Sequence, residues 1–221
     1  MQLYLLFLFA GLFVLSHVGL TSVGVKSALV RRLGDKGFMG IYTLVSFLTL
    51  GGAIVTYAFF GARGEQLWIP LGWDNPLVYI LMLLSILFIV LSTATPSPVG
   101  AEMAGPVMPV ARGILRVTAH PQNWGMICFG IAHVLVTGTA GGLVLYGAFA
   151  LLGIVGAYHE TAKKAKDRDP AVQAFLKETG VIPFSAILRR RNRLVIGEFA
   201  LPSLLVVLAV FGVSIGVHFL I

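Results

Sequence analysis

The sequence has few charged residues. Lys, Arg, Asp and Glu together make up 11% of its 221 residues, whereas a soluble domain has about 25%. A soluble protein needs charged side chains to cover its surface, so this shortage excludes an ordinary soluble fold. Apolar residues make up 57% of the chain and gather in long runs. The composition therefore predicts an integral membrane protein whose surface is mostly covered by lipid.

Cysteine and intramembrane acids are also scarce. Cys128 is the only cysteine, which excludes an internal disulfide, a Cys-based zinc cluster and the Cys-x-x-Cys-His attachment of c-type haem. The absence of Asp and Glu from the apolar runs argues against a proton-coupled transporter and a zinc site within them. The net charge of +7 comes from basic residues between these runs. There they would face anionic lipid rather than nucleic acid.

Six apolar segments are long enough, or nearly so, for a helix that crosses about 30 Å of hydrocarbon. The first has no basic residue before it and no small-residue cleavage site after it, so we expect it to be retained rather than cleaved as a signal peptide. Gly138-Thr139-Ala140-Gly141-Gly142 predicts a tight turn between the fourth and fifth segments, which would form a hairpin. The sequence thus predicts an all-α integral membrane protein, a six-transmembrane-helix bundle in a single domain over residues 1–221. The expected spans are 3–19, 38–60, 76–95, 121–136, 143–158 and 199–221.

The basic residues orient these helices. With six spans, 15 of the 16 Lys and Arg residues fall on one side, and only Arg63 falls on the other. Because positively charged loops stay in the cytoplasm, this distribution predicts an N-out/C-out topology in a bacterial cytoplasmic (inner) membrane. Short amphipathic helices are expected in the cytoplasmic loops. One follows Asp169, a predicted N-cap, and ends at Gly180, lying on the membrane or on the bundle; a second is expected over 109–117.

Two histidines fall inside predicted spans. His17 lies in the first helix, and His133 lies in the fourth, roughly 18 Å along its axis from Pro121. An ionisable side chain at membrane depth is costly and indicates a functional site. A neutral imidazole bonded to a facing helix remains the alternative. Two histidines on different helices of a bundle also suit a b-type haem, because each imidazole can donate one nitrogen to iron.

A third histidine lies at the start of the fourth helix. His120 would be at the membrane interface, where it is placed to act on a polar group. Trp124 follows one turn later, at a depth where a tryptophan often serves only as an anchor.

Several short motifs together resemble the NnrU family of bacterial membrane proteins, which is linked to nitrite and nitric oxide reduction. Plant 15-cis-zeta-carotene isomerases, which contain haem, look like distant relatives. This resemblance implies haem ligation by His17 and His133, with His120 as a further match in the fourth helix. The motifs are Ser16-His17, Leu33-Gly34-Asp35-Lys36-Gly37-Phe38, Ala119-His120-Pro121 with Trp124, Ala132-His133 and Gly180-Val181-Ile182-Pro183-Phe184-Ser185-Ala186-Ile187.

A second resemblance is to integral membrane methyltransferases of the isoprenylcysteine type. His120-Pro121 is followed by Glu160 at the spacing of that family's motif. Ala119 replaces its arginine and Thr161 its second glutamate, which weakens the case for the cofactor. The resemblance implies S-adenosylmethionine near His120, Glu160 and Trp124.

Three functions therefore remain open at this point. The first is an NnrU-type protein that binds b-type haem and performs redox or isomerase chemistry or handles nitric oxide. The second is an S-adenosylmethionine-dependent methyltransferase acting on a membrane-soluble or small thiol substrate. The third is a non-enzymatic membrane assembly factor or permeation route. We rank the haem hypothesis first because two histidines lie within the predicted spans.

Overall fold

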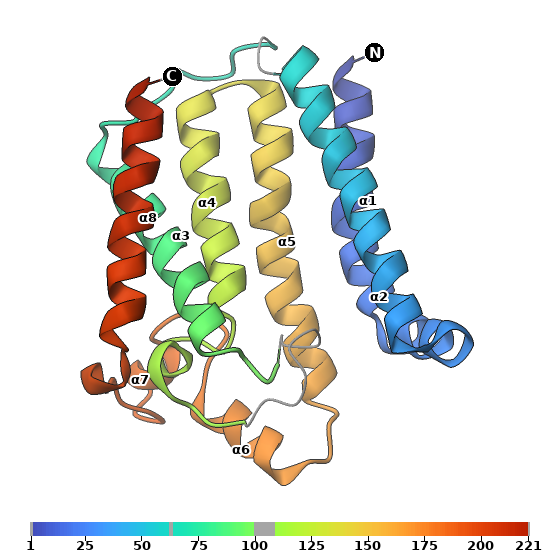
Figure 1. The fold of residues 1–221 in the computed structure, drawn as a ribbon, viewed down its shortest axis with the longest axis vertical. Coiled ribbons are helices and arrows are strands. Elements are labelled where there is room, and N and C mark those ends of the chain that lie inside the picture. The colour runs from blue at the N-terminus through green and yellow to red at the C-terminus, as the bar shows by residue number, and fades with distance from the viewer. Residues whose placement is uncertain (1, 62–63, 100–108, 221) are drawn as a thin grey trace. The chain divides into compact units, whose positions relative to one another are not determined.

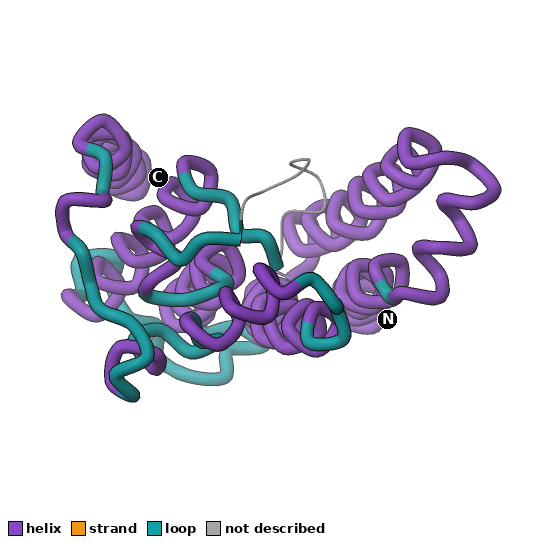
Figure 2. The backbone as a smooth tube through the Cα atoms, turned by 90° about the horizontal axis from the view of Figure 1, so that it is seen from below, coloured by secondary structure: helices purple, strands orange, loops and turns teal. Residues whose placement is uncertain are grey.

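The computed structural model describes residues 2–61, 64–99 and 109–220, without the side chains of Gln2, Phe219 and Leu220. Its regular segments are helices (Figure 1), and Figure 2 shows no strand among the described residues. Gln66 and Thr139 form an isolated antiparallel β-bridge. The predicted all-α class is confirmed. Arg63 lies outside the described residues.

Most element boundaries follow the apolar runs. Asn75 caps α3, its side-chain oxygen accepting a hydrogen bond of 3.0 Å from the Leu77 amide. The helices are α1 (Gln2–Thr21), α2 (Val23–Thr56), the π-helical η1 (Tyr57–Gly61), α3 (Pro76–Ala94), the 3₁₀ helix η2 (Gly113–Arg116), α4 (Pro121–Thr137), α5 (Ala140–Lys164), α6 (Pro170–Glu178), α7 (Ser185–Leu188), the 3₁₀ helix η3 (Ile196–Glu198) and α8 (Leu201–Leu220).

Five described helical stretches are long and apolar enough to cross a membrane. They are Leu3–Thr21, Val23–Gly61, Pro76–Ala94, Ala140–Lys164 and Leu201–His218. Many of their large apolar side chains are exposed, as expected where lipid is the solvent. The remaining predicted span, 121–136, corresponds to α4, which has 17 residues, slightly fewer than the ~20 that a full crossing needs. Six spans and the N-out/C-out topology therefore stay predictions.

The chain divides into two compact units. One consists of residues 1–78 and 129–152, and the other of residues 79–128 and 153–221. Both α4 and α5 are divided between the two units. That the whole chain acts as a single domain stays a prediction.

The first unit contains α1, α2 and the adjoining halves of α4 and α5. Its core includes Leu6, Ala53 and Leu145, one from each of α1, α2 and α5. α4 ends at Thr137 and α5 starts at Ala140 after Gly138, whose φ of 63° is readily adopted only by glycine. The predicted hairpin turn is therefore confirmed.

The second unit holds the amphipathic segments. Asp169 caps α6 by accepting a 2.8 Å hydrogen bond from the Ala171 amide, as predicted. α6 buries Phe175, which packs with Leu115 and Ala119 in a shared apolar cluster. The helix thus packs on the protein, which is one of its two predicted locations. The segment predicted as a helix over 109–117 contains only the short η2, whose Leu115 is 1% exposed.

The start of α2 differs from the sequence-based expectation. The predicted span begins at residue 38 and leaves the preceding basic residues in a loop, whereas the structure is helical from Val23. The helix breaks at Gly34, so its first turns run at an angle to the rest (Figures 1 and 2). Gly34 has φ 69° and ψ 172°, a backbone region that is essentially restricted to glycine.

Gly34→Ala should therefore destabilise the protein by about 1–3 kcal/mol, because alanine would be forced into that backbone region. Gly40→Ala is the matched control: Gly40 lies in the same helix, and a Cβ there meets nothing within 4 Å. It should be neutral or slightly stabilising, since alanine favours helix. Thermal unfolding of both variants in detergent measures the difference, and equal melting temperatures would contradict the role of Gly34.

Candidate functional site

His133 is a buried histidine of α4, with 8% of its surface exposed. Its Nδ1 lies 2.9 Å from the carbonyl oxygen of Phe129, one turn earlier in the helix. A carbonyl oxygen can only accept a hydrogen bond, so Nδ1 carries the proton. In the neutral ring the lone pair is then on Nε2, the state in which a histidine binds metal through that nitrogen.

Aromatic rings surround His133. Its ring centroid lies 4.0 Å from that of Phe129, 4.7 Å from Tyr146 and 5.3 Å from Trp73. These rings come from α4, from α5 and from the segment before α3. We call His133, Phe129, Tyr146 and Trp73 the His133 cluster. The cluster therefore combines an aromatic environment with one nitrogen lone pair, on Nε2 of His133, in an apolar part of the chain.

His17 has a similar local arrangement in α1. Its Nδ1 lies 2.8 Å from the carbonyl oxygen of Phe13, so Nε2 again carries the lone pair. The Ser46 hydroxyl lies 3.4 Å from Nε2, but it donates a shorter bond of 2.7 Å to the carbonyl of Tyr42. His218 of α8 makes the same type of Nδ1 contact, to Ser214 at 2.6 Å. The tautomer alone therefore does not distinguish a ligand from a helical histidine.

Three phenylalanine rings lie between His17 and His133. The Phe149 centroid is 5.7 Å from that of Phe13 and 5.4 Å from that of Phe129. We call Phe13, Phe129 and Phe149 the phenylalanine layer.

Each histidine ring lies against the phenylalanine four residues before it. The centroids are 4.4 Å apart for Phe13 and His17 and 4.0 Å apart for Phe129 and His133. The ring contacts therefore run from His17 through the phenylalanine layer to His133.

Each neutral imidazole has the type of nitrogen that would hold haem iron. The described ring contacts connect His17 to His133 only through Phe13, Phe149 and Phe129. Haem ligation by His17 and His133 stays a prediction.

His120 belongs to the second unit and is almost fully buried, with 2% exposed. Its Nε2 lies 2.6 Å from the Thr161 hydroxyl. Glu160, the residue predicted to act with it, instead pairs with Lys163 at 2.9 Å. Trp124 donates its indole N–H to the carbonyl of Val181 at 2.8 Å, so it holds a loop of the protein. Each of the three predicted cofactor-binding residues, His120, Glu160 and Trp124, thus has a partner within the protein.

Burial lowers the pKa of His120 to about 4. In the unfolded chain the ring titrates near pH 6.5, so below that pH the unfolded state takes up a proton that the folded state does not. The stability contributed by neutral His120 is therefore complete above pH 6.5 and falls between pH 6.5 and 4.

The loss should be about 3 kcal/mol at most. His120→Gln does not titrate but keeps a polar group near Thr161. The difference in unfolding free energy between wild type and this variant should shrink across that interval, as measured by denaturant titration. A constant difference would contradict the burial of a neutral ring.

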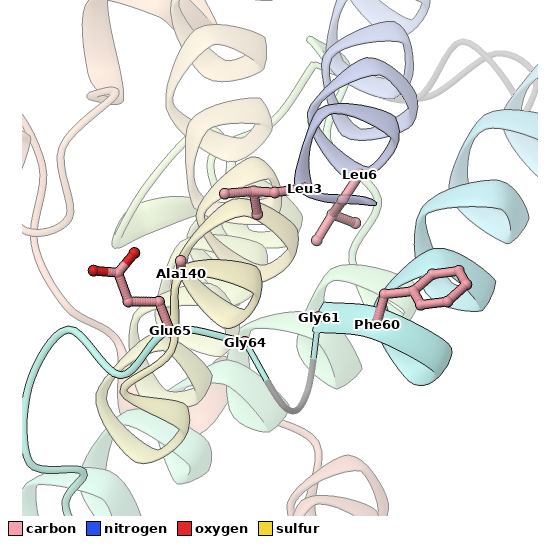
Figure 3. A pocket seen from close by; sticks show the side chains of 7 residues that line it. All are labelled: Leu3, Leu6, Phe60, Gly61, Gly64, Glu65 and Ala140. Atoms are coloured by element: carbon pink, nitrogen blue, oxygen red, sulfur yellow. The ribbon is translucent and has the colours of Figure 1, made fainter. Parts of the chain in front are cut away.

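A separate cavity of about 220 Å³ lies near the turn between α4 and α5 in the first unit (Figure 3). It contains none of the predicted site residues. Its lining consists of Leu3, Leu6, Phe60, Gly61, Gly64, Glu65 and Ala140.

The sequence alone does not predict the partners of His133. Trp73 lies in a connecting segment, and Tyr146 lies in an apolar helix where an aromatic residue usually serves for packing. The period of the helices indicates no particular neighbour for either ring. Among the described residues, no group of three or more His, Cys, Asp or Glu side chains could hold a metal ion.

Comparisons with known proteins identify the family of this chain. The family described as NnrU protein matches residues 5–221. The 15-cis-zeta-carotene isomerase of Arabidopsis thaliana chloroplasts is 26% identical over 215 residues, covering 94% of this chain and 57% of that protein. The Zea mays protein of the same name is 24% identical over 185 residues, covering 83% and 50%. The chain thus spans about half the length of these relatives. No solved structure matches.

Proposed function

Because the chain belongs to the NnrU family, we propose that it is a membrane protein that isomerises an apolar, unsaturated substrate. The similarity to two 15-cis-zeta-carotene isomerases, one of them over 94% of this chain, carries the proposal. The apolar helices would let such a substrate enter from the bilayer. The chain corresponds to only about half of each relative. The isomerase activity of this chain is therefore a proposal.

The His133 cluster suits such a substrate chemically. A conjugated chain of double bonds presents π faces that pack favourably on Trp73, Phe129 and Tyr146. These rings would orient the substrate beside Nε2 of His133 and exclude water. The neutral imidazole offers a lone pair without the cost of burying a charge.

We propose further that the protein binds b-type haem through His17 or His133. A bound haem would supply an iron centre whose oxidation state can change. The proposal is supported by the burial of His133, which is 8% exposed, against the rings of Phe129 and Tyr146. The Nδ1–carbonyl bonds of His17 and His133 are compatible with it, because they leave the lone pair of each imidazole on Nε2. A role in nitrite or nitric oxide metabolism and a place in the bacterial cytoplasmic membrane are proposed on the family resemblance.

The methyltransferase alternative has less support. S-adenosylmethionine carries a carboxylate and a sulfonium, which need side chains that are available for pairing. Here His120 is hydrogen-bonded to Thr161, and Glu160 is paired with Lys163. Both side chains therefore already have partners within the protein. The assembly-factor alternative predicts a colourless protein without isomerase activity.

The proposal can be tested with purified full-length protein in detergent. We expect it to convert 15-cis-zeta-carotene to another geometric isomer, as followed by chromatography, and to show a Soret band after growth with haem. His218→Phe is the matched control for substitutions of His17 and His133, since His218 makes the same type of Nδ1 contact in another helix. An unchanged isomer ratio with haem-loaded protein would refute the isomerase proposal. A colourless preparation from haem-replete cells would refute haem binding.

A further inference from the structure

The segment before α8 exposes both basic and large apolar side chains. Leu188 is 81% exposed and Ile196 is 78% exposed. Four exposed arginines lie between them, at positions 189, 190, 191 and 193. We call residues 182–199 the arginine loop; Figure 1 shows it around α7, next to the start of α8.

The backbone of this loop is fixed rather than loosely exposed. Phe184 and Arg190 have φ values of 62° and 55°, which non-glycine residues adopt only when surrounding contacts hold them there. The Phe184 amide donates to the carbonyl of Val117 at 2.8 Å, and the Arg191 amide donates to that of Ala186 at 2.9 Å. Ala186 is fully buried. The arginines are therefore presented from a rigid turn.

The protein does not neutralise most of these charges. Arg189, Arg190 and Arg193 make no side-chain hydrogen bond or ion pair with any residue in the described ranges, and Arg191 only donates to the carbonyl of Lys177 at 3.0 Å. Arg116, which contacts the loop through Glu198, differs from these arginines because its charge is neutralised. It binds both carboxylate oxygens of Glu198 at 2.7 Å.

The position of the loop indicates which partner it meets. The candidate span of α8 starts at Leu201, three residues after the end of η3, so the loop lies where the chain approaches the hydrocarbon layer. Arginine presents a planar fork of donors that matches phosphate. Leu188 and Ile196 offer apolar surface that lipid chains would cover.

We propose that the arginine loop is a binding surface for the headgroups of anionic phospholipids. The guanidinium groups of Arg189, Arg190 and Arg193 bind the phosphates, and Leu188 and Ile196 insert beside them. The surface would hold the start of α8 at a fixed depth. This inference does not depend on the proposed isomerase or haem chemistry.

Native mass spectrometry of the full-length protein with phosphatidylglycerol or phosphatidylcholine tests the proposal. The wild type should prefer phosphatidylglycerol. The triple variant R189Q/R190Q/R193Q should lose roughly fivefold in affinity for each arginine removed, without a change for phosphatidylcholine. The control R31Q/R32Q/K36Q removes the same charge from α2 and should keep most of the preference.

A second pair of variants tests the apolar part. Leu188→Ser with Ile196→Ser should weaken retention of both lipids, whereas Ile69→Ser, at a site that is 90% exposed, should not. Equal losses in the two triple variants would overturn the proposal, because binding would then follow net charge alone. Displacement of bound phosphatidylglycerol by inorganic phosphate at equal concentration would overturn it too, since a free anion would be the ligand.

Discussion

Replacing Gly130 with leucine should remove nearly all folded protein from detergent extracts. A Cβ at Gly130 would lie 2.5 Å from the carbonyl oxygen of Tyr146 and 2.8 Å from the amide nitrogen of Ala150. Both atoms belong to the backbone of α5, which cannot rotate away as a side chain can. The two helices of the hairpin would have to separate, and the loss of packing would spread to the His133 cluster through Tyr146.

The smaller substitution Gly130→Ala should have a smaller effect. Overpacking by one carbon costs about 1–3 kcal/mol, so Gly130→Ala should lower the thermal midpoint while leaving some folded protein. Gly147→Leu is the control from the same hairpin, because a Cβ there meets only Leu143 Cδ1 at 3.9 Å. Yield and monodispersity by size-exclusion chromatography give the readout. If both leucine variants behaved alike, the close approach of α4 and α5 would not be needed for folding.

The positions of most helices could be predicted because lipid imposes a simple requirement. Backbone polar groups in hydrocarbon must be paired within the helix, so long apolar runs indicate helices whatever their neighbours. The turn at Gly138 followed from the same logic, since 38 residues are too many for one crossing. The helix before Gly34 was missed because basic residues and glycine resemble a loop. A helix outside the apolar layer needs no long apolar run.

The site was less predictable than the helices. Membrane depth singled out His17 and His133. Which rings separate them depends on how α1, α4 and α5 pack, and no helical period encodes the contact of Phe149 with Phe13 and Phe129. The partner of His120 differed for a related reason. Glu160 and Thr161 are adjacent in sequence, but they point in different directions on a helix.

His133→Phe should reduce haem content and isomerase activity by at least about tenfold, the scale of losses when metal-site geometry is disturbed. Phenylalanine keeps a ring among Trp73, Phe129 and Tyr146, so the packing of the His133 cluster is largely preserved. What disappears is the nitrogen with the lone pair. Haem per protein by pyridine haemochrome assay is the first measurement, and the thermal midpoint shows whether the fold has survived.

The companion variant His17→Phe shows whether one histidine or two bind the iron. If a single iron used both, either substitution would convert a low-spin, six-coordinate spectrum to a high-spin one. The phenylalanine layer argues for unequal effects, with one variant losing the haem and the other keeping it. Phe149→Ala sharpens the test because it thins the layer: it should raise the low-spin fraction if the histidines can approach each other. Wild-type spectra in all three variants would remove both histidines from the ligand set and leave His133 as a packing residue of α4.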